Sequence, residues 1–354
     1  MTMTAPDELD APLRRPDLAR PKLPLWSFIV IAIIAIGISA ALLAIGAIHG
    51  YAAFAVIAAL LYIVAQTIAS SAVEGWRHGK DRLMTSVLVV SVVLALLPLV
   101  AILAYTIAAG LKRFDGEFFT HSMRAVAETD PNGGAYNAII GTLEQVGIAT
   151  IIAVPFGIMV AIYLVEYSSG RLGRVVSFFV DVMTGLPSIV AGLFILALWI
   201  LVLHQSFSGF AGSLALLILM LPTVVRSSEE MLKLVPTALR EASFALGVPK
   251  WKTVVRIVLP TALPGIVTGV MLAISRVMGE TAPVLLTVFG NPAINNNPFS
   301  GAQASLPLFV FSEVGASSDN AINRAWAGAL TLILIVLLLN LVARTVARFA
   351  RVRG

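Results

Sequence analysis

The sequence predicts an all-α integral membrane protein with about eight transmembrane helices. Hydrophobic residues make up 58% of the 354 residues and charged residues only 12%, whereas a soluble domain carries roughly 25% charged residues. The apolar residues also occur in runs near the roughly 20 residues that a helix needs to cross a bilayer. Because the runs lack the short alternating pattern of barrel strands, helices are the structure in which the backbone can satisfy its own hydrogen bonds in lipid.

The eight apolar runs define the expected spans. The first run follows a basic stretch without an evident small-residue cleavage site, and a second run follows almost at once. We therefore expect a retained helix and not a signal peptide. The expected spans are 26–48, 51–73, 83–110, 141–166, 175–203, 212–232, 261–289 and 327–349.

The distribution of Lys and Arg predicts the orientation of these spans. With a cytoplasmic N-terminus, most of the 24 basic residues fall in inside segments, as the positive-inside rule requires. Both termini are then cytoplasmic. This distribution also accounts for the net charge of +5, so the basic composition does not indicate a nucleic-acid partner. The basic residues expected outside are Lys112, Arg113, Arg124 and Arg324.

Four segments are expected along the chain. The first two spans form a tight hairpin without charged residues, and a polar linker separates them from the rest. The other six spans hold every intramembrane charge and flank both long outer loops, 111–140 and 290–326, so we place the function there. The segments are a cytoplasmic tail (1–25), a transmembrane hairpin with its linker (26–82), a six-span core (83–349) and a basic C-terminal tail (350–354).

The loop between the sixth and seventh spans, 236–260, is expected to contain two short helices. Pro236 suits a first helical turn and Gly247 a left-handed C-terminal cap, while Pro249 can start the second helix. The first helix would carry a small apolar face built from Ala238, Ala242 and Ala245. On spacing alone, this helix could lie on lipid headgroups as an amphipathic anchor or sit in a shallow groove of another protein.

A longer pattern in this loop resembles that of a known family. Glu241-Ala242-Ser243, then Gly247, then Ile257-Val258-Leu259-Pro260 is similar to the EAA loop of ABC-importer permeases, E-A-A-x3-G-x9-I-x-L-P. Ser243 in place of the second Ala is the departure. The resemblance implies a MetI-like six-helix core and a coupling helix held in a cleft of a separate ATPase subunit. Glu241, Ala242 and Ser243 would lie in that helix, and Gly247 would make the turn out of it.

Charged residues inside the expected spans require a partner or a water-filled cavity, because placing a charged side chain at mid-bilayer costs about 3 kcal/mol or more. Arg276 and Glu280 stand four residues apart and can neutralise each other on one helix face. They could lock two helices together or line an anion pathway, since guanidinium suits phosphate-like oxyanions. Helix packing is the favoured interpretation for Asp181. Arg226 could snorkel to the interface or belong to the pathway.

Two further segments resemble phosphate-uptake permeases, the A-type subunit (PstA) more than its C-type partner. They run from Gly185 to Phe194 and from Ser275 to Pro283. The resemblance implies uptake of inorganic phosphate across a bacterial inner membrane, with Arg276 and Glu280 as functional positions. It also implies a PstC-like second permease, two PstB-like ATPases and an extracytoplasmic PstS-like phosphate-binding protein. The first two spans are extra relative to this six-span plan.

The sequence gives no sign of an enzyme active site. It lacks the G-x4-G-K-[ST] phosphate loop, so ATP would be bound by partner subunits, and we expect no cofactor in this chain. Cysteine is absent, and the four His residues have no metal-ligand spacing. Two alternatives remain open. One is an ion-coupled secondary transporter of an anion, with Arg276, Glu280 and Asp181 as a relay, and the other is a membrane scaffold.

Overall fold

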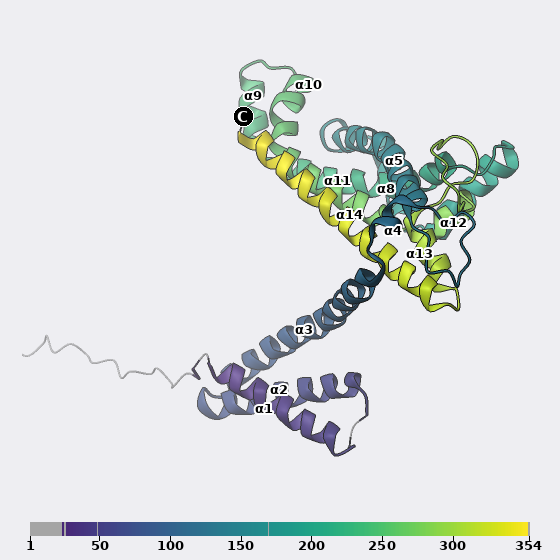
Figure 1. Cartoon of the computed structure of the whole chain (residues 1–354). Coiled ribbons are helices and arrows are strands. Elements are labelled where there is room, and N and C mark those ends of the chain that lie inside the picture. Colours follow the sequence, from purple (N-terminus) through teal and green to yellow (C-terminus); the bar gives the residue numbers. More distant parts are fainter. Residues whose placement is uncertain (1–22, 25, 48, 169, 353–354) are drawn as a thin grey trace, which may run out of the picture. The chain divides into compact units, whose positions relative to one another are not determined.

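The computed structural model describes residues 23–24, 26–47, 49–168 and 170–352, with side chains described as far as residue 345. The expected N-terminal tail therefore lies outside the described residues except for Leu23 and Pro24. Of the expected C-terminal tail, only the backbone of residues 350–352 is described. The chain divides into two compact units, Met1–Leu103 and Ala104–Gly354, which are described separately (Figure 1).

The first unit contains a helical hairpin and the start of a long helix. Helices α1 (Trp26–Ala44) and α2 (Tyr51–Val73) pack against each other. Helix α3 (Trp76–Gly110) begins two residues after Glu74, so most of the segment expected as a linker is helical. A 3-10 turn, η1 (Leu111–Arg113), extends α3 in the second unit.

Glu74 fixes the corner between α2 and α3. Its carboxylate accepts hydrogen bonds from the hydroxyl of Ser70 at 2.7 Å, the backbone N–H of Leu23 at 2.8 Å and Nε of Arg82 at 3.4 Å. These hydrogen bonds, that of Ser70 foremost, hold the pKa of Glu74 at about 2 instead of 4.5, because donors to a carboxylate favour its charged form. Glu74 is therefore ionised at neutral pH although it is buried.

The second unit is built from helices that differ greatly in length. The first are α4 (Gly116–Thr120), α5 (Tyr136–Ile162) with a π-helical turn η2 (Tyr163–Tyr167), α6 (Arg171–Thr184), α7 (Ser188–Ile195) with the π-helical η3 (Leu196–Val202), and α8 (Gly209–Lys233). They are followed by α9 (Thr237–Ala245), α10 (Lys250–Thr253), the π-helical η4 (Val254–Val258), α11 (Leu259–Met278), α12 (Ala282–Thr287), α13 (Leu306–Val314) and α14 (Asp319–Val352). Helices α9 and α10 lie at one end of α11 and α14, and α13 lies at the other (Figure 1).

The core of the second unit forms where α5, α8 and α11 meet. Buried side chains from all three helices build one apolar cluster, which includes Ala149, Ala153, Met220, Val224 and Ala273. Small residues let helix backbones approach closely in a membrane protein. Gly157 of α5 illustrates this, because a Cβ placed there would lie 2.7 Å from Cγ1 of Val224 on α8.

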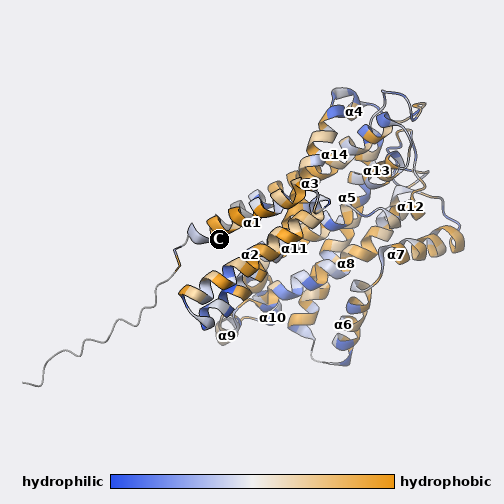
Figure 2. Cartoon of the chain, turned by 90° about the horizontal axis from the view of Figure 1, so that it is seen from below, coloured by the Kyte–Doolittle hydropathy of each residue, from blue (hydrophilic) through white to orange (hydrophobic). Residues whose placement is uncertain are grey.

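The structure confirms the predicted all-helical membrane fold. Among the described residues, seven helices are long and apolar enough to cross a bilayer, and one bent pair brings the number to eight if it counts as one span. The described residues contain no β-strand, only an isolated bridge between Phe289 and Gln303. Figure 2 shows hydrophobic residues along the long helices and hydrophilic residues around α4 and α9.

Two of the predicted spans are not continuous helices. The expected span 175–203 is the pair α6 and α7, bent by 104° between Thr184 and Ser188. Pro187 lacks a backbone N–H and disfavours helical geometry in the residue before it, so the helix breaks at Gly185-Leu186-Pro187. The expected span 261–289 stops at Met278, and α12 starts again at Ala282, directly before Pro283.

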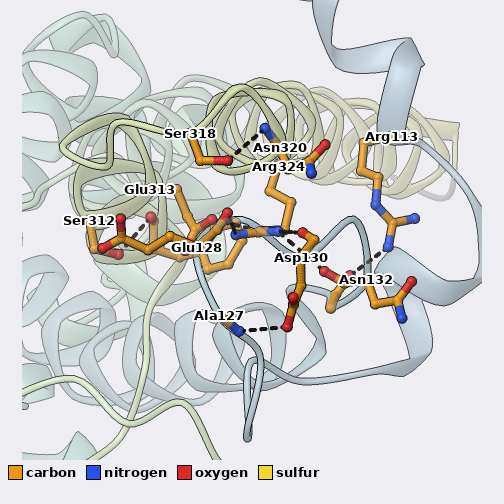
Figure 3. Close-up of polar contacts among 12 residues, drawn as sticks. Arg113, Ala127, Glu128, Asp130, Asn132, Ser312, Glu313, Ser318, Asn320 and Arg324 are labelled. Atoms are coloured by element: carbon orange, nitrogen blue, oxygen red, sulfur yellow. Dashed lines mark hydrogen bonds and ion pairs between the residues drawn. The ribbon is translucent and has the colours of Figure 1, made fainter.

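A buried arginine holds the segment before α5 in place. The side chain of Arg324 on α14 is 0% exposed, and its Nε donates to the carboxylate of Glu313 on α13 at 2.7 Å. Its terminal nitrogens donate to the backbone carbonyls of Asp130 at 2.6 Å, Asn132 at 3.3 Å and Glu128 at 3.2 Å. Figure 3 shows these contacts converging on one guanidinium. Arg324 therefore connects α13, α14 and residues 128–132.

We predict that Arg324→Ala lowers the free energy of unfolding by about 3–5 kcal/mol, because it leaves the carboxylate of Glu313 buried without its counter-charge. Equilibrium unfolding of the purified protein in detergent measures this loss. Arg124→Ala is the matched control, since Arg124 lies in the same segment and is exposed. Equal effects of the two substitutions would contradict the prediction.

Candidate coupling loop and pathway residues

The loop 236–260 forms the predicted helix with a left-handed glycine after it. Helix α9 starts at Thr237, directly after Pro236. Gly247 has φ of +74°, its N–H donates to the carbonyl of Phe244 at 2.9 Å, and the N–H of Val248 donates to that of Ser243 at 3.2 Å. These two bonds make a Schellman cap, which ends α9 and turns the chain toward α10.

Ser243 joins the two helices of the loop. Its side chain is buried, with the residue 3% exposed, and its hydroxyl forms a 2.8 Å hydrogen bond with the hydroxyl of Thr253 on α10. The serine that departs from the EAA pattern therefore faces inward. An alanine at this position could not make the bond, so α9 and α10 are connected here by a contact that the family pattern does not provide.

The outward face of α9 is apolar and exposed. Glu241 and Ala242, the first two residues of the EAA pattern, are both exposed. Around them the helix presents small and apolar side chains, and Leu246 at its end is 83% exposed. The exposed members of this face are Ala238, Leu239, Ala242, Ala245 and Leu246, and Phe244 is exposed on another side of the helix. No described residue of the second unit buries this face.

Sequence reasoning missed the residues that anchor α9. Arg240 donates from Nε to the carboxylate of Glu166 at 2.9 Å, and from its terminal nitrogens to the carbonyls of Val235 at 2.6 Å and Leu232 at 2.9 Å. Leu232 lies in the last turn of α8, whose carbonyls have no N–H four residues further along the helix to bond, and Val235 lies two residues beyond the end of α8. A basic residue shortly after a helix end is a signal for such capping, but nothing in the sequence relates Glu166 to Arg240.

The structure brings together two of the predicted pathway residues, Asp181 and Arg226. Arg226 on α8 forms an ion pair with Asp181 on α6, and it donates to Ser177 on the same helix, to the carbonyl at 3.1 Å and to the hydroxyl at 2.9 Å. It also pairs with Glu229 at 2.5 Å, and Glu229 with Lys233 at 2.7 Å. The contacts tie α6 to α8, in agreement with the helix-packing interpretation of Asp181.

The expected pairing of Arg276 with Glu280 is wrong. Helix α11 ends at Met278, so Glu280 lies beyond its end and the four-residue spacing no longer places both side chains on one face. The side chain of Arg276 is exposed, and it forms no ion pair or hydrogen bond within the part of the chain that the structure describes. A guanidinium without a counter-charge is therefore available at this end of α11.

The two segments that resemble phosphate-uptake permeases both lie at helix breaks, and they pack on each other. One covers the bend before α7 and α7 itself, and the other covers the interruption between α11 and α12. Helix α7 contacts α12, and a Cβ on Gly192 would lie 2.8 Å from Cα of Pro283. Gly192 therefore allows the close approach of these two short helices.

The described residues contain no group of three or more His, Cys, Asp or Glu side chains that could hold a metal ion. The polar groups of this unit instead form ion pairs between helices and caps at helix ends. Together, the interrupted membrane helices and the exposed, anchored loop define the membrane-spanning permease subunit of a transporter. The model of the binding-protein-dependent transport system inner membrane component matches residues 153–352, and the chain belongs to this family.

Within the family, the chain is a PstA-type permease of an ABC transporter. It is 51% identical to the phosphate transport system permease protein PstA 1 of Mycobacterium tuberculosis H37Rv, over 78% of this chain and 90% of that protein. It is 51% identical to PstA of Mycobacterium leprae, over 75% and 88% of the two chains. The identity to PstA of Yersinia pestis is 39%, over 77% and 92%.

We predict that Gly247→Ala opens the cap of α9. A Cβ at this position meets no other atom within 4 Å, so the loss of about 1–2 kcal/mol in the stability of the cap comes only from the left-handed backbone. Hydrogen exchange of the amides of residues 247 and 248 measures this loss, and both amides should exchange faster. Gly247→Asn is the control, because Asn tolerates this conformation better than Ala does. Equal protection in the Gly, Ala and Asn proteins would contradict the prediction.

Proposed function

We propose that this chain forms one half of the membrane pathway through which a bacterial importer takes up inorganic phosphate. A PstC-like permease would form the other half, two PstB-like subunits would bind and hydrolyse ATP, and a PstS-like protein would deliver phosphate from outside. The exposed, anchored face of α9 carries this proposal, because it offers a docking site for a separate protein. The phosphate transport system names of the relatives support the choice of substrate.

The orientation follows from the charges around this loop. Basic residues gather at and after the end of α8 and in the loop itself, and such residues mark cytoplasmic segments. They are Lys233, Arg240, Lys250, Lys252 and Arg256. The loop would then face the ATPases inside the cell, with both termini on the same side and the segment before α5 outside.

The two pathway arginines both lie toward the C-terminal ends of their helices, but the two helices run in opposite directions relative to the loop. Helix α8 runs toward the loop, and at about 1.5 Å per residue Arg226 lies about 10 Å before its end. Helix α11 runs away from the loop, which places Arg276 about 26 Å along it from Leu259. In the proposed orientation, Arg226 is near the cytoplasmic side and Arg276 is toward the outside.

The different surroundings of the two arginines suggest different roles. Arg226 is neutralised by Asp181 and Glu229, so in this conformation it joins α6 to α8 and has little to offer an anion. Arg276 keeps its donors free within the described residues, and a guanidinium can hold an oxyanion in a bidentate arrangement. We assign the contact with phosphate to Arg276, and the closure of the cytoplasmic end to the bridge between Arg226 and Asp181.

The function is tested with proteoliposomes that hold the complete set of subunits. We expect phosphate uptake only with ATP inside and the binding protein outside, and none when the ATPase subunits are omitted. Sulfate in place of phosphate tests the substrate. Uptake by this chain alone, driven by an ion gradient, would overturn the proposal in favour of a secondary transporter.

Arg276→Gln should lower the rate of phosphate uptake by about tenfold or more, because hydrogen bonds to charged groups contribute about 1.5–3 kcal/mol. Its effect on stability should be small, since the side chain is exposed and unpaired among the described residues. Arg226→Gln should instead destabilise the protein, because it leaves the buried Glu229 and Asp181 without their shared partner. Uptake rates and unfolding midpoints separate the two effects.

Arg174→Gln is the control for both substitutions, since Arg174 is an exposed residue at the start of α6 without a polar contact among the described side chains. It should leave uptake and stability unchanged. Unchanged stability in Arg226→Gln, or normal uptake in Arg276→Gln, would contradict the assigned roles.

A further inference from the structure

Arg240 and Glu166 connect the loop helix α9 to two membrane helices at once. Arg240 is held between the C-terminal carbonyls of α8 and the carboxylate of Glu166, which follows α5 in its π-helical extension η2. The side chains of Arg240 and Glu166 are 14% and 6% exposed. The ion pair is therefore largely shielded from water. A charge pair that is shielded in this way is screened much less than one at the surface.

The second helix of the loop converges on the same residue. Lys250, the first residue of α10, donates its ammonium group to the backbone carbonyl of Glu166 and also lies over the ring of the neighbouring Tyr167. The carboxylate of Glu166 thus binds Arg240 of α9, and its main-chain carbonyl binds Lys250 of α10. The hydroxyl pair of Ser243 and Thr253 fixes these two helices to each other, so the loop is a single rigid piece attached to α5 at Glu166.

Helix α5 extends from this attachment to the opposite end of the unit. Along its length it packs against α8 and contributes to the central apolar cluster. At its far end, Thr142 accepts the N–H of Leu306 at 2.7 Å, and Gln145 donates to Gln303 at 2.9 Å. A displacement of Glu166 along α5 would therefore reach the segment that precedes α13.

We propose that Arg240 and Glu166 are positioning residues that transmit movement of the docked loop to α5. This inference rests on the proposed function, because it presupposes an ATPase on the outward face of α9. The pair itself takes no part in docking, since both side chains point away from that face and are largely buried. Without the pair, α9 would still carry its docking face and its connection to α8 along the chain. It would lose its direct link to Glu166, and Lys250 of α10 would be the remaining polar contact of the loop with that residue.

The test uses the complete transporter in proteoliposomes, with Arg240→Ala and Glu166→Gln each introduced alone. Three quantities are measured: the ATPase subunits that co-purify, the rate of ATP hydrolysis, and the phosphate taken up per ATP hydrolysed. We expect bound and active ATPase in both variants, with uptake per ATP lowered by about fivefold or more, the lower range of typical coupling between sites. Arg171→Ala, an exposed arginine at the start of α6, is the control and should change none of the three.

Arg240→Lys provides a second variant that keeps the protein intact. Lysine keeps a positive charge beside the carboxylate of Glu166, but it cannot bond the carboxylate and both carbonyls at the same time. Uptake per ATP should therefore fall between the wild-type and alanine values. Unchanged uptake per ATP in Arg240→Ala and Glu166→Gln would overturn the inference, and so would loss of the ATPase from either variant, which would make the pair a docking contact. Failure of the wild-type chain to bind an ATPase would overturn the proposed function instead.

Discussion

The main chain of a membrane protein has to satisfy its own hydrogen bonds wherever it is surrounded by lipid, and every interruption of a helix in this molecule has to meet that requirement. The main-chain groups at these interruptions are satisfied in two ways. Where α6 gives way to α7 and α11 to α12, the N–H groups after the helix end donate to carbonyls of the last turn, as Leu186 does to Met183 and Glu280 to Val277. At the end of α8, an arginine supplies further donors, since Arg240 bonds the carbonyls of Leu232 in the last turn and of Val235 just beyond it.

The arginines of the second unit therefore have different structural roles, which depend on their bonding partners. Arg324 and Arg240 each combine one carboxylate with several backbone carbonyls. Arg324 thereby fixes the irregular segment 128–132, and Arg240 anchors α9 to η2 and to the end of α8. Arg226 bridges two helices through carboxylates. Arg276 stands without a polar partner among the described side chains. Guanidinium suits all of these positions because its donors lie in one plane and point in several directions. The same residue type thus supplies both the fixed ends of the unit and the guanidinium of Arg276, which is exposed near the end of α11.

Much of the fold could be predicted from the sequence, because hydrophobic runs measure the length of a membrane helix directly. The cap at Gly247 was also predictable, since glycine adopts the left-handed conformation without strain. Hydropathy could not distinguish a straight span from the bent pair α6 and α7, because the run of largely apolar residues continues from one helix into the other. The pairing of Arg276 with Glu280 was wrong because the spacing rule assumes a helix that continues past Met278. The contacts of Arg226 with Asp181 and of Arg240 with Glu166 join residues far apart in the chain, and no local pattern indicates them.

The hydroxyl pair of Ser243 and Thr253 has a consequence for how this loop can change during evolution. Each residue is buried, so replacing Ser243 by the alanine of the EAA pattern would remove the side-chain partner that the hydroxyl of Thr253 has on α9. Replacing Thr253 by a residue without a hydroxyl would likewise remove the partner of Ser243. Removing one hydroxyl lowers the stability more than removing both together, because it leaves a buried polar group without its partner. Permeases of this type should therefore keep both hydroxyl residues or have neither, and the identity of the third EAA residue should covary with the position ten residues later.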